Sequence, residues 1–114
     1  MTKQEFIDSL LTEHDYISYS AEPDTFYKRV PTSVKCKTNH KPPQYSLTVR
    51  SLTVHGNLWE AFSINIVGET TINEWANLSY YSIPLTSITK LSKLEQSLQT
   101  LWEAINDKRT TETN

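Results

Sequence analysis

The sequence predicts an α+β domain in which an antiparallel sheet carries helices on one of its faces. Three observations support this fold class. Apolar residues recur at helical spacing near both ends of the chain, and they alternate with polar residues through its middle. The chain also holds 3 Trp, 6 Tyr and 3 Phe in 114 residues, a share that favours a core rich in sheet.

The first expected element is a helix over residues 3–13. Thr2 and Glu5 have the spacing of a capping box, in which each side chain accepts a hydrogen bond from the other residue's backbone N–H. The apolar residues that follow share one arc of the helix: Phe6, Ile7, Leu10 and Leu11.

Short strands are expected at residues 16–20 and 25–30, with a turn over 21–24 between them. Residues 31–43 contain three prolines and no periodic apolar pattern, so they are expected to form a loop.

The middle of the chain predicts an antiparallel meander, so that the sheet has three to five strands. Tyr45, Leu47 and Val49 alternate with polar residues, and the apolar phase then shifts at Ser51, which predicts a bulge or a bend. Three further segments complete the meander: a turn at His55-Gly56-Asn57, a strand over 59–67 with Phe62, Ile64 and Ile66 on one face, and, after a turn at 68–70, a strand over 72–82.

A C-terminal amphipathic helix is expected to follow Pro84, which ends the sheet. Ser92 and Glu95 form a second capping-box pattern, and apolar residues repeat at helical spacing as far as Asn106: Leu91, Leu94, Leu98, Leu101 and Ile105. Both helices are expected to pack on one face of the sheet. The prediction is a single α+β domain over 1–106 with a flexible C-terminal tail over 107–114.

Charge is distributed unevenly along the chain. The formal net charge is −2, yet residues 25–59 contain six basic residues and no acid, between two segments of net negative charge. A basic cluster of this kind attracts anionic partners, and it can equally pair with the protein's own acids.

The leading hypothesis is a small non-enzymatic binding or adaptor protein. Trp59, Trp75 and Tyr81 are expected on the sheet face opposite the helices, where exposed aromatic rings form an apolar docking surface. The basic segment 28–50 would select the partner by charge. The expected partner is another protein or a second copy of the chain.

The first alternative is a single-stranded nucleic-acid binding protein. Basic side chains would contact phosphates, and the rings of Tyr27 and Tyr45 would stack on bases. The basic residues concerned are Lys28, Arg29, Lys35, Lys37, Lys41 and Arg50. The sequence pI of about 5.9 counts against this alternative, because proteins that bind nucleic acid are usually basic.

Little in the sequence indicates catalysis or a cofactor. With only 2 glycines the chain cannot form a P-loop, a dinucleotide-binding turn or a serine-hydrolase elbow. Cys36 with His40 and His55 falls short of the ligand set of a structural zinc site, so no metal is expected. A small enzyme that uses Cys36 as nucleophile and a histidine as base is the second alternative.

The expected location is the cytoplasm, without membrane association. The N-terminal segment is acidic where a signal peptide would be basic, and no apolar run approaches the ~20 residues that span a bilayer. A single cysteine also agrees with a reducing compartment.

Overall fold

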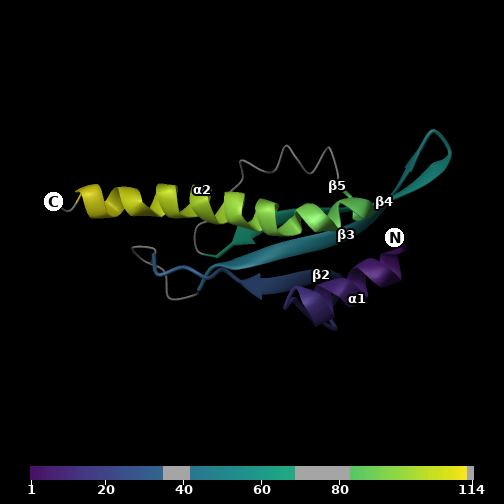
Figure 1. The fold of residues 1–114 in the computed structure, drawn as a ribbon, viewed down its shortest axis with the longest axis horizontal. Coiled ribbons are helices and arrows are strands. Elements are labelled where there is room, and N and C mark those ends of the chain that lie inside the picture. Colours follow the sequence, from purple (N-terminus) through teal and green to yellow (C-terminus); the bar gives the residue numbers. More distant parts are fainter. Residues whose placement is uncertain (35–41, 69–82, 113–114) are drawn as a thin grey trace.

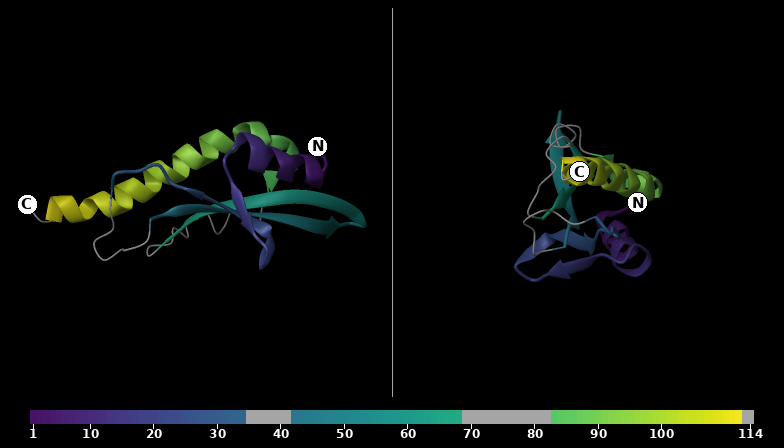
Figure 2. Two further views of the ribbon diagram at one scale, coloured as in Figure 1. Left: turned by 90° about the horizontal axis from the view of Figure 1, so that it is seen from below. Right: turned by 90° about the vertical axis from the view of Figure 1, so that its left-hand side faces the viewer.

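An antiparallel five-stranded sheet lies beneath two helices, both on the same face (Figures 1 and 2). The computed structural model describes residues 1–34, 42–68 and 83–112. The strands lie side by side in their chain order, so the sheet is the meander that the sequence predicts. The elements are α1 (Lys3–Glu13), β1 (Ile17–Tyr19), β2 (Glu22–Arg29), β3 (Gln44–Val54), β4 (Asn57–Val67), β5 (Ile83–Pro84), the 3₁₀ helix η2 (Leu85–Lys90) and α2 (Leu91–Glu112). The predicted α+β fold class is confirmed.

Helix α1 begins at the predicted capping box. The backbone N–H of Glu5 donates to the Thr2 hydroxyl, and the backbone N–H of Thr2 donates to the Glu5 carboxylate. Both donor–acceptor distances are 3.1 Å. These two bonds satisfy N–H groups that the first turn of a helix leaves without partners. Phe6 and Leu10 are buried, and the Phe6 ring packs 5.1 Å from the ring of Phe62 on β4.

Alternation along β2, β3 and β4 fills the space between the sheet and the helices. Phe26, Leu47 and Ile64 are opposite one another in register, and all three are buried. The helices supply the other side of this core, which is the expected result when apolar residues occur at period 2 in strands and near period 3.6 in helices. Its buried helical members are Phe6, Leu10, Leu85, Ile88, Leu91, Leu98 and Trp102.

The turn between β1 and β2 differs from the prediction. It lies at Ser20-Ala21, and β2 already includes Pro23 and Asp24, which the sequence places in the turn. Proline is compatible with this position because the pairing of β2 with β3 begins only at Thr25, so no hydrogen bond to β3 is lost. The predicted strand over 72–82 and most of the turn over 68–70 lie outside the described residues.

The sequence predicts a bulge or a bend in β3 at Ser51, and of these the bulge is wrong. The register of β3 and β4 runs without interruption from Gln44 opposite Val67 to Val54 opposite Asn57. The apolar phase changes after Ser51 because the strand leaves the body of the domain there, so burial no longer selects one face. Thr53 and Val54 are both exposed.

A tight turn closes this hairpin at His55-Gly56. Both residues have positive φ, 51° for His55 and 79° for Gly56, as the two-residue type I′ turn requires. The hairpin extends past the ends of the helices and of β1 and β2 (Figure 2, left). We define its distal part, residues 49–60, as the hairpin arm.

The second predicted capping box is also wrong. Helix η2 runs directly into α2, and Leu91 at the junction already has helical φ and ψ of −57° and −44°. Ser92 therefore lies inside helical structure, and the Glu95 side chain is free to bind elsewhere. Helix α2 continues to Glu112, beyond the predicted end at Asn106. The division into a domain over 1–106 and a flexible tail stays a prediction.

Candidate functional site

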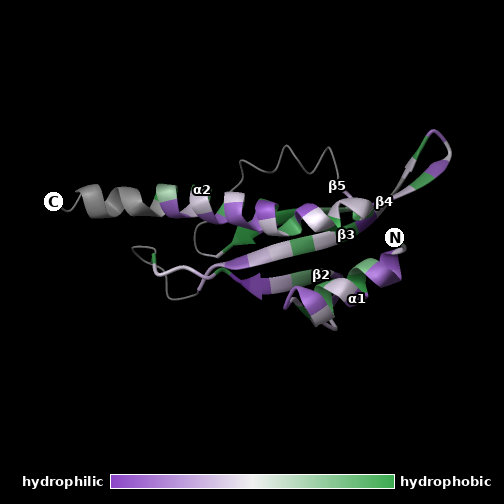
Figure 3. Ribbon diagram, in the orientation of Figure 1, coloured by the Kyte–Doolittle hydropathy of each residue, from purple (hydrophilic) through white to green (hydrophobic). Residues whose placement is uncertain are grey.

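The hairpin arm exposes large apolar side chains near its tip. Leu58 is 69% exposed, Trp59 53% and Val54 45%. Hydropathy colouring shows apolar positions within this extension as well as in the interior of the domain (Figure 3). Exposure of this kind in a projecting element is typical of a docking surface.

The two faces of the arm carry different apolar residues. Phe62 of β4 faces the helices, and side chains alternate along a strand, so Trp59 lies on the opposite face, as predicted, and Leu58 on the same face as Phe62. Val54 shares a face with Trp59, because it lies diagonally across from it in the β3–β4 register. Trp75 and Tyr81, which the sequence groups with Trp59, lie outside the described residues.

The three described basic residues of the segment differ in accessibility. Arg29 and Arg50 are exposed, whereas Lys28 is half-buried and paired with Glu95. The three other lysines, Lys35, Lys37 and Lys41, lie outside the described residues, as do Cys36 and His40.

The two tyrosines of the nucleic-acid hypothesis occupy different environments. Tyr45 is 2% exposed, and its ring faces the interior, so it offers no surface for stacking a base. Tyr27 is half-buried on the face away from the helices, packs 5.6 Å from Tyr19 and donates a hydrogen bond to Glu22.

Glu95 of α2 forms the centre of a polar cluster under the helix. Its carboxylate accepts hydrogen bonds from the Tyr16 hydroxyl at 2.7 Å and the Lys28 ammonium at 2.9 Å. Its main-chain carbonyl accepts a third, from the Tyr45 hydroxyl at 2.9 Å. The Lys28 ammonium also lies 5.2 Å from the centre of the Tyr16 ring, where the ring's negative face attracts it. One helical residue is thus held by the segment before β1 and by strands β2 and β3.

Two further polar residues extend this attachment along α2. Gln99 donates to the Pro31 carbonyl at 2.7 Å, and Glu103 accepts a hydrogen bond from the Thr32 hydroxyl. Glu95, Gln99 and Glu103 are spaced by four residues, so they share one stripe of the helix. Both side chains are half-buried, and the sequence does not predict these contacts, because hydropathy does not reveal polar partners contributed by a distant segment.

The cluster changes the acidity of its tyrosines. Burial, then the Glu95 charge and the hydrogen bond to it, raise the pKa of Tyr16 well above its ordinary value. Burial, followed by the charges of Glu95 and Glu103, raises the pKa of Tyr45. Both hydroxyls therefore stay protonated and act as donors at neutral pH.

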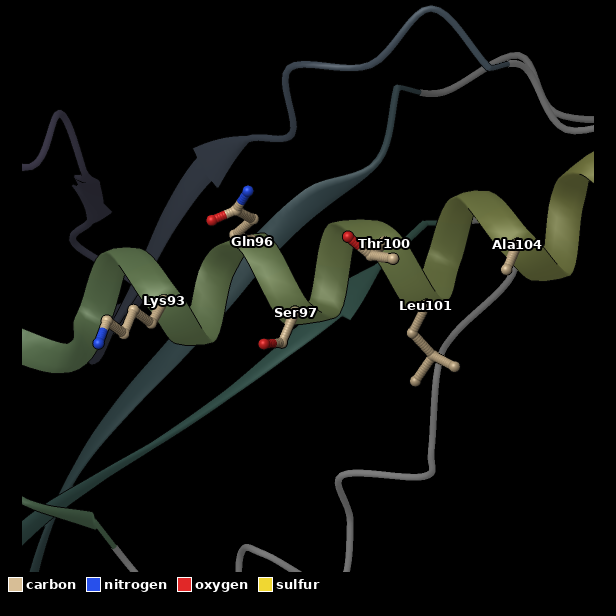
Figure 4. A pocket seen from close by; sticks show the side chains of 6 residues that line it. All are labelled: Lys93, Gln96, Ser97, Thr100, Leu101 and Ala104. Atoms are coloured by element: carbon tan, nitrogen blue, oxygen red, sulfur yellow. The ribbon is translucent and has the colours of Figure 1, made fainter.

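Among the described residues, neither a groove nor a group of metal-binding side chains forms a second candidate site. An open depression of about 740 Å³ runs along α2 (Figure 4), and all six described residues that line it belong to that helix: Lys93, Gln96, Ser97, Thr100, Leu101 and Ala104. Among the described residues, no second element brings a polar group to this depression, unlike a typical ligand site. Among the described residues, no three His, Cys, Asp or Glu side chains are grouped as metal ligands.

Comparisons with protein-family models, curated proteins and solved structures find no match for this chain. Within the described ranges, no helix is both long enough and apolar enough to cross a membrane.

Removing the Glu95 carboxylate is expected to destabilise the domain. In Glu95→Ala, Lys28 and Tyr16 lose their acceptor in a poorly solvated position, which costs about 2–3 kcal/mol of unfolding free energy after allowance for the partial exposure of Lys28. Urea unfolding measures this change.

A surface ion pair supplies the matched control. Lys3 and Asp24 are 3.2 Å apart and largely exposed, so Lys3→Ala should change the unfolding free energy by about 0.5 kcal/mol or less. Equal costs for Glu95→Ala and Lys3→Ala would contradict the structural role of the cluster.

Alkaline pH is expected to weaken the domain through Tyr16. A raised pKa in the folded state means that the stabilisation is fully present below about pH 10, the ordinary tyrosine value, and is lost as pH rises above it. The unfolding free energy of the wild type should fall relative to that of Tyr16→Phe by up to about 1.4 kcal/mol per pH unit above pH 10. Parallel curves for the two proteins would show that Tyr16 ionises equally in the folded and unfolded states.

Proposed function

We propose that the protein is a non-enzymatic binding or adaptor protein whose hairpin arm docks a protein partner. The observation that carries this proposal is the exposure of Val54, Leu58 and Trp59 on an element that projects beyond the body of the domain. Exposed leucine and valine side chains on a projecting ribbon supply apolar contact area, and tryptophan is among the residues that most often dominate binding energy.

The charges around the arm support a protein partner. From Ser51 to Trp59 the chain has no formally charged side chain when His55 is neutral, and Arg50 and Glu60 flank this stretch. An apolar centre bordered by polar and charged groups is the usual arrangement of a protein–protein interface. A nucleic-acid surface would instead need several accessible cations beside exposed rings.

The polar cluster supports a structural rather than a catalytic role for the buried groups. The Tyr16 hydroxyl and the Lys28 ammonium donate to the Glu95 carboxylate, and the Tyr45 hydroxyl donates to the Glu95 main-chain carbonyl, so each of these three groups has a hydrogen-bond partner within the fold. None of the described residues that line the depression along α2 belongs to the polar cluster.

Substitution of the arm's apolar side chains tests this proposal. The wild-type chain is used to capture partners from an extract of its source cells, and a captured protein is then purified and titrated against the variants. Leu58→Ser and Trp59→Ser should each weaken its binding by about tenfold or more, because the partner encloses the arm and each substitution removes an apolar anchor from one of the arm's two faces.

Leu11→Ser is the matched control, because Leu11 is an exposed leucine (42%) on α1, away from the arm. Its affinity should equal that of the wild type. A purified partner that binds Leu58→Ser and Trp59→Ser as tightly as the wild type would contradict the docking role of the arm.

A further inference from the structure

The β3 edge of the hairpin arm has no neighbouring strand among the described residues. The pairing of β2 with β3 stops at Thr25 opposite Thr48, whereas β3 continues to Val54. Residues 49–54 are therefore paired with β4 on one side and open on the other. Figure 2 shows the arm continuing past the ends of β1 and β2.

The backbone groups that point to this open edge can be identified. The Val30 amide donates to the Pro43 carbonyl at 3.0 Å, so Pro43 directs its carbonyl toward the β2 side of the hairpin. In an antiparallel pair this direction repeats at every second residue. Tyr45 and Leu47 therefore direct their N–H and C=O groups toward β2, and Ser51 and Thr53 direct theirs toward the same side, beyond the end of the β2 pairing.

The turn gives the same result independently. In a two-residue hairpin the residues that flank the turn, Val54 and Asn57, form a hydrogen-bonded pair, so Val54 directs its N–H and C=O toward β4. Leu52 directs its N–H and C=O the same way as Val54. Ser51 and Thr53 alternate with these two residues and direct their N–H and C=O toward the open edge.

This edge carries one feature that usually prevents pairing with another strand, the charged side chain of Arg50, and lacks the others. Residues 49–54 contain no proline, no lysine and no bulge, and Ser51 and Thr53 are both exposed. A two-stranded ribbon with no covering layer is also only marginally stable in water, and a third strand would stabilise it.

We propose that a second copy of the chain pairs with this edge, so that two hairpin arms join into one antiparallel four-stranded sheet. Ser51 lies opposite Thr53 of the second copy and Thr53 opposite its Ser51, with the two-fold axis passing Leu52. Because the same two residues supply donors and acceptors on both sides, the contact is closed and self-complementary. The pairing presupposes the proposed role of the arm and names a second copy as its partner.

Two observations favour this register. A register with more overlap between the two copies would bring the second copy's turn against β2. Strand β2 already pairs with this edge of β3 from Gln44 to Thr48. In the proposed register Arg50 lies opposite Val54 of the second copy, so the two arginines are not opposed, and the uncharged tips meet without repulsion. Trp59 stays on a face of the joined sheet rather than at the shared edge, and it remains accessible to a further partner.

Sedimentation of the full chain across a wide range of concentrations tests the pairing. The wild type should show a monomer–dimer equilibrium. Thr53→Pro removes an N–H from the open edge without affecting the ladder to β4, so the dimer dissociation constant should rise by about tenfold or more. Thr53→Val keeps the N–H and should dimerise like the wild type.

Cysteine cross-linking tests the register even if the proline variant fails to fold. With Cys36→Ser as background, Leu52→Cys places two cysteines at a non-hydrogen-bonded pair with Cα atoms about 4.5 Å apart, within disulfide range. Val54→Cys is the matched control, because its two copies would lie four residues, roughly 13 Å, apart. Oxidation should link Leu52→Cys dimers and leave Val54→Cys unlinked.

A wild-type chain that stays monomeric throughout would overturn the pairing, as would a dimer that neither responds to Thr53→Pro nor cross-links at position 52. If Leu58→Ser still weakens binding of another protein while the chain is monomeric, the pairing fails and the docking role of the arm stands. If neither association responds to changes in the arm, both proposals fail.

Discussion

The continuous ladder between β3 and β4 is the constraint on which the rest of the structure depends. Because its register is uninterrupted from Gln44–Val67 to Val54–Asn57, one pair of strands both carries the centre of the core and projects beyond it. Leu47 and Ile64 lie beneath the helices, whereas Leu58 and Trp59, further along the same ladder, face solvent. A bulge at Ser51 would break this continuity. Because the register is uninterrupted, the arm is a continuation of the two strands that carry the core.

The Glu95 cluster fixes how much of the sheet the helices cover. Three hydroxyl or ammonium donors, from Tyr16, Lys28 and Tyr45, converge on this residue and hold α2 across the strands. Gln99 and Glu103 then attach the segment after β2 to the same helix. With α2 held in place, the large apolar residues of the sheet's inner face are buried, and those of the arm are left outside. The polar cluster thus helps to determine which apolar surface remains exposed and available for the proposed docking role.

The sequence predicts the fold well because periodicity reports burial. It identifies α1 with its cap, the alternation in β3 and β4, and the apolar stripe that begins at Leu91. It fails where hydrogen-bond partners are distant in the chain. The spacing of Glu95 from Ser92 predicts a capping box, yet the donors to the Glu95 carboxylate are Tyr16 and Lys28, far away along the chain. The same limit applies to the site. Trp59 could be found from its residue type and strand position, whereas the open edge at Ser51 and Thr53 depends on where β2 stops pairing, which composition does not encode.

Amide hydrogen exchange along residues 49–54 tests most directly the central claim, that the arm is a formed ribbon whose β3 edge is open. At low protein concentration the amides of Leu52 and Val54, bonded to β4, should exchange slowly, and those of Ser51 and Thr53 should exchange fast. Raising the concentration should protect Ser51 and Thr53 as copies pair. Uniformly fast exchange would show that the arm is not a formed ribbon. Protection of Ser51 and Thr53 that is the same at every concentration would show that the chain itself covers this edge, and either result would contradict the account.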